Sequence, residues 1–96
     1  MPAYWIAHVT VTDPERYKAY QALAPSAFAA FGGRFLARGG AHSVLEGPAL
    51  DRHVIIEFPN LEAARACYAS PAYTAARQAR DGASIAHVTL VDGLPL

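Results

Sequence analysis

Apolar side chains along the chain fall into four short runs of strand-like composition, separated by stretches with helical spacing. The runs are rich in β-branched and aromatic residues, as strands are. They cover residues 3–11, 34–38 with a continuation over 43–46, 53–58 and 84–91. The pair Gly39-Gly40 interrupts the second run, which predicts a bulge or bend there. The pattern therefore predicts four strands.

A long helix is predicted after the first strand, where apolar residues recur at spacings of three and four. Asp13 is suited to the N-cap and Pro14 to the first helical position. Pro25 lies within the apolar stripe, so we expect the helix to be kinked or split just before it. The pair Gly32-Gly33 predicts the end of the helix.

Two further caps divide the second helical stretch. Asn60 caps a helix that begins at Leu61, and Ser70-Pro71 repeats the signal for a short helix that includes residues 73–80. The predicted order is β-α-β-β-α-α-β, an α+β, ferredoxin-like arrangement with an antiparallel sheet. Because no linker or change of composition interrupts it, we expect one domain over residues 1–96.

The first predicted strand is apolar on both of its faces. Alternation places Tyr4, Ile6 and His8 on one face, and Trp5 and Ala7 on the other. The helices of a ferredoxin-like unit cover one face only, so the other face would expose more apolar surface than monomers tolerate. We therefore expect a second copy of the chain to cover that face, in a closed homodimeric α/β barrel.

Composition narrows the classes of partner. The 96 residues are 53% hydrophobic, which suffices for a packed core, and the net charge of zero argues against binding to nucleic acid or an anionic membrane. The longest uncharged stretch, residues 19–33, is shorter than the roughly 20 apolar residues of a membrane span. The N-terminus lacks the pattern of an export signal, and a single cysteine forms no internal disulfide. These features predict a cytoplasmic protein.

A set of local motifs resembles a known family. They are Gly-Gly-Arg-Phe-Leu-Ala-Arg-Gly-Gly at 32–40, Leu-Glu-Gly at 45–47, Ile-Glu-Phe-Pro at 56–59 and Tyr-Ala-Ser-Pro-Ala-Tyr at 68–73. With the opening Tyr-Trp-Ile and Asp-Pro-Glu-x-Tyr, the order resembles the family of domain of unknown function 1330 over essentially the whole chain. Where that family usually has tryptophan, this chain has Cys67.

The resemblance implies membership of the dimeric α/β barrel superfamily. That superfamily also contains cofactor-free antibiotic-biosynthesis-type monooxygenases, chlorite-dismutase-like haem proteins and muconolactone-isomerase-like enzymes. The resemblance thus implies a fold and a homodimer more directly than it implies a reaction.

Four histidines are the first candidates for site chemistry: His8, His42, His53 and His87. Their spacing fits no metal signature, and no cysteine or carboxylate cluster accompanies them, so we expect neither a metal ion nor a cofactor. His8 and His87 occupy matching positions in strands that are neighbours in this fold. We expect these two to lie close together, either lining a cavity or as ordinary half-buried sheet residues.

Arg38 and Glu57 are charged residues on otherwise apolar strands, where each is costly to bury without a partner. Because their strands are neighbours, an ion pair between them is one interpretation. The other is that they are polar anchors at the edge of a ligand cavity. The weaker candidates for the lining of that cavity are His8, His87, Tyr17 and Tyr68.

Three functions remain open at this point. The leading hypothesis is a homodimer that binds a small, mostly apolar organic molecule in a cavity between sheet and helices. The alternatives are a cofactor-independent monooxygenase or isomerase, and a structural or partner-binding dimer without a ligand. A cavity with several polar side chains would disfavour the last, and a base beside a hydrogen-bond donor would favour the enzyme.

Overall fold

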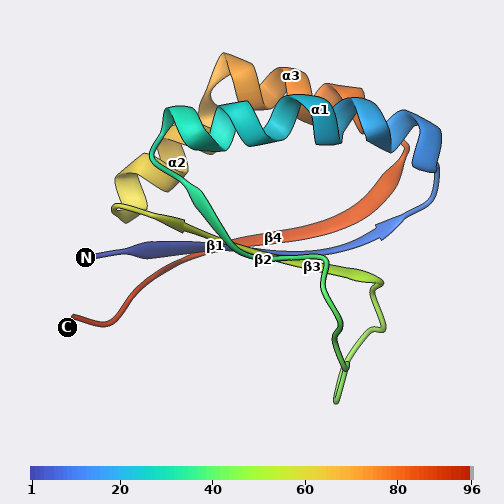
Figure 1. Ribbon diagram of the computed structural model, residues 1–96, viewed down its shortest axis with the longest axis horizontal. Coiled ribbons are helices and arrows are strands. Elements are labelled where there is room, and N and C mark those ends of the chain that lie inside the picture. The colour runs from blue at the N-terminus through green and yellow to red at the C-terminus, as the bar shows by residue number, and fades with distance from the viewer. Residues whose placement is uncertain (96) are drawn as a thin grey trace.

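The computed structural model describes residues 1–95, which form a four-stranded antiparallel sheet with three helices on one of its faces (Figure 1). The elements are β1 (Ala3–Val11), α1 (Pro14–Ala30), β2 (Arg34–Arg38), β3 (Arg52–Phe58), α2 (Leu61–Ala69), α3 (Pro71–Ala79) and β4 (Ser84–Asp92). The strand order is β2-β3-β1-β4. The predicted ferredoxin-like α+β fold is confirmed.

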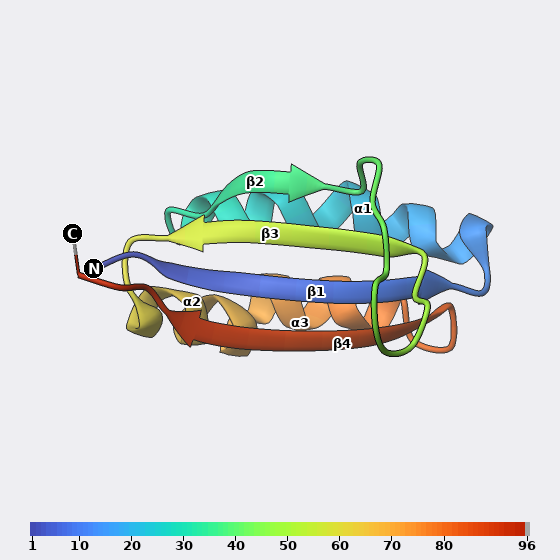
Figure 2. The ribbon, with the colours of Figure 1, turned by 90° about the horizontal axis from the view of Figure 1, so that it is seen from below.

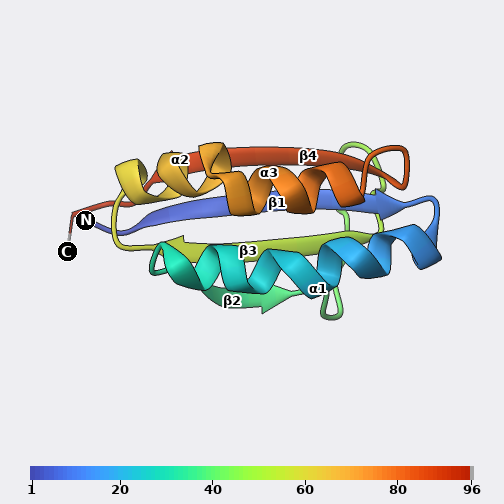
Figure 3. The same ribbon diagram turned by 90° about the horizontal axis from the view of Figure 1, so that it is seen from above.

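The helices lie in one layer above the sheet, with α1 over β3 and β2, and α2 and α3 over β1 and β4 (Figure 3). No helix in residues 1–95 is long and apolar enough to cross a membrane. The face of the sheet opposite the helices, called the open face below, carries no helix (Figure 1). One face of the sheet is therefore covered by helices and the other is not.

The core lies between the helices and the sheet and is centred on Trp5 of β1. The ring centroid of Trp5 is 5.0 Å from that of Phe28, 6.0 Å from Phe58 and 4.9 Å from Tyr73. Trp5, Phe58 and Tyr73 are fully buried. Aromatic side chains of this size bury about 150–250 Å² each, so the cluster dominates the burial that holds helices to sheet.

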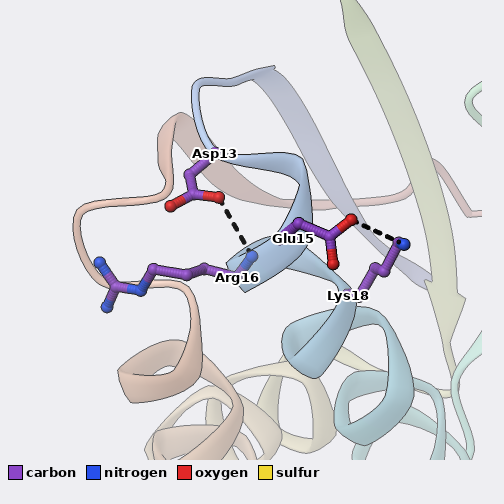
Figure 4. Close-up of polar contacts among 4 residues, drawn as sticks. All are labelled: Asp13, Glu15, Arg16 and Lys18. Carbon is purple, nitrogen blue, oxygen red and sulfur yellow. Dashed lines mark hydrogen bonds and ion pairs between the residues drawn. The ribbon is translucent and has the colours of Figure 1, made fainter.

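Helix α1 begins at the predicted cap and continues past its internal proline. The Asp13 carboxylate accepts a hydrogen bond from the Arg16 backbone N–H at 3.3 Å, and Glu15 pairs with Lys18 on the helix surface (Figure 4). The expected split before Pro25 is wrong, because the helix runs unbroken from Pro14 to Ala30. Buried residues on both sides of the proline hold the helix against the sheet despite the missing N–H.

Ser70 ends α2 and begins α3. Its hydroxyl group donates to the Cys67 carbonyl at 2.7 Å and accepts from the Tyr73 backbone N–H at 3.1 Å. Asn60 caps α2 by accepting from the Ala63 N–H at 2.8 Å. Both predicted caps are therefore present.

The expected continuation of the second strand over 43–46 is wrong. Strand β2 ends at Arg38, and residues 39–51 form a loop without helix or strand. Backbone bonds fix both ends of the loop, from Gly39 N–H to the His53 carbonyl at 2.9 Å and from Asp51 N–H to the Val9 carbonyl at 3.0 Å. Between these bonds the loop crosses β1 and β4 on the open face (Figure 2).

Candidate functional site

A small cavity lies between α1 and the helix-covered face of the sheet. Its volume is about 40 Å³. The rings of Trp5, Phe28 and Phe35 form much of its wall, together with small aliphatic side chains. The polar side chains that reach it are Tyr17, Tyr20, Gln21, Arg38 and Arg52. The cavity between α1 and the sheet is thus mostly apolar and is reached by several polar groups.

Two arginines border this cavity without carboxylate partners. The guanidinium of Arg38 lies over the Phe35 ring, 4.3 Å from its centroid. The Nε of Arg52 is buried and has no hydrogen-bond partner in the structure. Neither guanidinium forms an ion pair within residues 1–95. Neither positive charge is therefore neutralised by a carboxylate of the described residues, and the Arg52 Nε lacks an acceptor among them.

Arg38 and Glu57 do not pair, because they lie on opposite faces of the sheet. Glu57 accepts from the Nε of Arg34, its register partner, at 3.3 Å on the open face. Arg38 is the register partner of Val54 and faces the helices with it. A β-bulge between Phe35 and Ala37 causes the difference, since the extra residue reverses the alternation of β2.

The two candidate tyrosines lie in different places. Tyr17 is buried and lines the cavity; burial raises its pKa, while the nearby charges of Arg52 and Arg80 oppose that rise. Tyr68 is on α2, at an open groove beside β4, and accepts a hydrogen bond from Arg77 at 3.3 Å. Only Tyr17 therefore belongs to the cavity that also holds Arg38.

Tyr20 and Arg52 are cavity residues that the sequence reasoning missed. The hydroxyl groups of Tyr20 and Tyr73 lie 2.8 Å apart, and burial raises the pKa of both phenols. The spacing of Tyr20 indicates only a helix core position, whereas Arg52 precedes the predicted third strand. Extending the alternation of that strand back from Val54 places Arg52 on the helix-covered face, so this signal was present in the sequence.

The histidines gather on the open face instead. His8 lies opposite both His53 of β3 and His87 of β4 in the sheet register, so the expected proximity of His8 and His87 holds for their backbones. With His42, they line a pocket of about 550 Å³ between this face and the 39–51 loop. The Nδ1 atoms of His8 and His53 are 2.7 Å apart. None of the four lines the cavity under α1.

No group of three or more His, Cys, Asp or Glu side chains within residues 1–95 stands in an arrangement ready to hold a metal ion. Cys67, the single cysteine, is buried in α2, and burial raises the pKa of its thiol to about 11. A thiol in that state is not a nucleophile at neutral pH.

Sequence comparison identifies a family but no characterised relative. A family model described as "Domain of unknown function (DUF1330)" matches residues 2–94. Among curated proteins, none matches this sequence.

Solved structures with the same fold come from bacteria and a plant. A protein of unknown function from Rhodopseudomonas palustris is 22% identical, with a TM-score of 0.78 over 99% of this chain and 84% of its own. SnoaB, a cofactor-independent oxygenase from Streptomyces nogalater, is 17% identical, with a TM-score of 0.63 over 99% of this chain and 95% of its own. An Arabidopsis thaliana protein is 15% identical, with a TM-score of 0.69 over 99% of this chain and 90% of its own. At these identities the likeness concerns the fold.

Proposed function

The chain belongs to the family of domain of unknown function 1330, and on that premise we propose that it is a cytoplasmic homodimer that binds a small organic molecule in the cavity under α1. The ligand has a mostly apolar body with one anionic group. The body contacts the aromatic wall around Trp5, and the anionic group contacts Arg38 and Arg52.

The two arginines at the cavity without a carboxylate partner in residues 1–95, and the unpartnered Arg52 Nε in particular, carry this proposal. A buried donor without an acceptor costs roughly 1–3 kcal/mol, so a ligand oxygen that accepts from the Arg52 Nε would offset that cost. Planar guanidinium groups also match a carboxylate in geometry. A carboxylate with a small aromatic or aliphatic body therefore fits the lining best.

The size of the cavity limits the ligand. Drug-sized molecules occupy pockets of about 300–1,000 Å³, whereas this cavity measures about 40 Å³. The ligand is therefore small, and the cavity widens as it enters. The Arg38 side chain is the element that moves, because Arg38 is exposed and lies across the Phe35 ring.

The lining favours binding over the enzymatic alternative. It contains no carboxylate and no imidazole, and burial raises the pKa of its two tyrosines, Tyr17 and Tyr20. A general base that operates near neutral pH is therefore missing from this cavity. The presence of several polar side chains in the cavity also disfavours a dimer whose role is purely structural.

The intrinsic fluorescence of Trp5 tests the binding proposal, since this single tryptophan forms part of the cavity wall. Benzoate and its neutral analogue benzamide are suitable first probes. We expect a saturable change with benzoate, an affinity lower by about tenfold for Arg52→Met, and no change in affinity for Arg34→Met, which alters the opposite face. Equal responses to both probes, or no saturation with benzoate, would contradict the proposed anion site.

Exposed apolar side chains on the open face support the homodimer. Ile85 and Val91 of β4 are 53% and 44% exposed, and the partly exposed Tyr4, Ile6 and Ile55 lie on the same face of neighbouring strands. An apolar surface of this kind on a sheet without a helix layer is typical of an interface.

Sedimentation equilibrium at micromolar concentration tests the dimer. We expect twice the mass of one chain for the wild type and a single-chain mass for Ile85→Lys. Leu23→Lys is the matched control, because Leu23 is 47% exposed on the outer surface of α1. A monomeric wild type would refute the interface.

A further inference from the structure

All four histidines of the chain line the pocket between the open face and the 39–51 loop, and the proposed cavity function uses none of them. We propose that His8, His53 and His42 bind one divalent transition-metal ion, of the zinc, nickel or copper class. The site uses no residue of the α1 cavity, so it does not depend on the proposed ligand binding. It shares the open face with the proposed dimer interface, and it therefore rests on that interface leaving the pocket free.

The pair His8 and His53 forms the fixed part of this site. The two residues are register partners on adjacent strands, and their Nδ1 atoms lie 2.7 Å apart. Both nitrogens accept when unprotonated, so one of them must carry a proton in this contact. When a metal ion binds there, that proton moves to the Nε2 of the same ring, because a metal-ligating imidazole nitrogen carries no proton.

Only a small rearrangement separates this contact from metal geometry. Zinc–nitrogen bonds are about 2.0–2.1 Å long, so two ligands in a tetrahedral site lie about 3.3 Å apart. The two Nδ1 atoms therefore separate by about 0.6 Å on binding. Side-chain rotation supplies such a displacement without moving the strands. The need for it is consistent with the absence of a preformed three-ligand group in residues 1–95.

His42 supplies the third ligand from the loop. Its ring centroid is 4.3 Å from that of His53, and its Nδ1 contacts only the Gly40 carbonyl, at 3.3 Å. The loop is exposed and tied to the strands by backbone bonds near its two ends, which leaves His42 free to turn towards the pair. A carboxylate, Glu46, lines the same pocket and offsets part of the charge of the ion.

The ligand chemistry selects the class of ion. Imidazole nitrogens favour zinc, copper and nickel, whereas magnesium and calcium favour oxygen ligands. The Nε2 of His53 is buried and has no hydrogen-bond partner in the structure. Metal-bound histidines usually donate their second N–H to an acceptor, which strengthens the site. Because that support is missing, we expect micromolar rather than tighter affinity.

Isothermal titration calorimetry with zinc and nickel chloride tests the proposal. The protein must carry no histidine tag. We expect one ion per chain, with affinity falling at least tenfold in His8→Ala and in His53→Ala, and less in His42→Ala. Thr89→Ala is the control, since Thr89 is exposed on the same face outside the pocket and should bind as the wild type does.

Two further measurements keep the result interpretable. Trp5 fluorescence verifies that each variant is folded, because Trp5 lies in the core on the other side of the sheet. Nitrogen-15 spectra of the imidazoles should show that zinc shifts the Nδ1 signals of His8 and His53. Absence of binding would overturn the site, and so would binding that is unchanged in both His8→Ala and His53→Ala. A stoichiometry of one ion per two chains would contradict a site made by the residues of one chain.

Discussion

The hydroxyl groups of Tyr20 and Tyr73 lie 2.8 Å apart and link α1 to α3. Tyr73 is fully buried, and its ring contacts those of Trp5 and Phe28. The two phenols therefore satisfy one another within an otherwise aromatic interface. Each depends on the other, since a buried hydroxyl without a partner is costly.

Tyr20→Phe should lower the free energy of unfolding by about 1–2 kcal/mol, because it removes the hydroxyl group that pairs with the buried Tyr73 hydroxyl. The double variant Tyr20→Phe, Tyr73→Phe should lose less than the sum of the two single variants. Urea unfolding followed by Trp5 fluorescence measures all three, and Tyr68→Phe, at an exposed phenol, is the control. Strict additivity of the two changes would contradict the proposed mutual dependence.

The charge pair on the open face should contribute little to stability in a single chain. The Arg34 side chain is 71% exposed, and exposed pairs contribute about 0–1 kcal/mol. In double-mutant cycles read by urea unfolding, Glu57→Gln should couple with Arg34→Met by no more than about 1 kcal/mol, and it should not couple with Arg38→Met. Coupling with Arg38 instead would contradict the assignment of Arg38 and Glu57 to opposite faces of the sheet.

Ser70→Ala should destabilise the protein by about 1–2 kcal/mol, because one hydroxyl group caps the start of α3 and also bonds the end of α2. Thermal unfolding followed by circular dichroism measures the loss. Ser26→Ala is the matched control, since Ser26 is exposed in the middle of α1 and should have little effect. Equal effects of the two changes would show that the cap contributes nothing.

Cys67 should react slowly with thiol reagents in the folded protein. Burial raises its pKa to about 11, so at pH 8 only about one thiol in a thousand is ionised. Labelling with a disulfide reagent should be slow in native buffer and immediate in guanidinium chloride. Rapid labelling of the folded chain would contradict the buried position.

The same thiol affects stability at high pH. The unfolded chain releases this proton at a lower pH than the folded chain does, because the pKa is raised only on burial. The contribution to stability is therefore complete below about pH 9 and is lost as the pH rises towards 11. The free energy of unfolding, measured with urea, should therefore fall less over that pH interval in Cys67→Ala than in the wild type.

Local signals were sufficient to predict most of the fold. The caps at Asp13, Asn60 and Ser70 act on neighbouring backbone groups, so the sequence alone locates the helix starts. Residues 43–46 have strand-like composition, but a strand also needs a neighbour to pair with, and the loop provides none. The helix break predicted at Pro25 is absent for a related reason. Packing of α1 on the sheet outweighs the local tendency of proline to interrupt a helix.

The candidate site was harder to predict, because the face of the sheet on which a strand residue lies depends on the register of strand pairing. One extra residue in β2 moves Arg38 from the open face to the helix-covered face. No local sequence pattern predicts that bulge at Leu36. The histidine cluster combines three strands and a loop, so spacing along the chain carries no sign of it. Only the pairing of β1 with both β3 and β4 brings His53 and His87 to His8.

The alternation of β1 has a consequence for how this protein can change over evolutionary time. Trp5 and His8 are close in sequence, yet they line pockets on opposite sides of the sheet, and no residue of the described chain lines both pockets. Substitutions at even-numbered positions of this strand can therefore accumulate without disturbing the aromatic core. Substitutions at odd-numbered positions can likewise accumulate without altering the open face. A lineage can thus remodel one surface while selection preserves the other, which allows descendants of the same fold to acquire unrelated activities on its two sides.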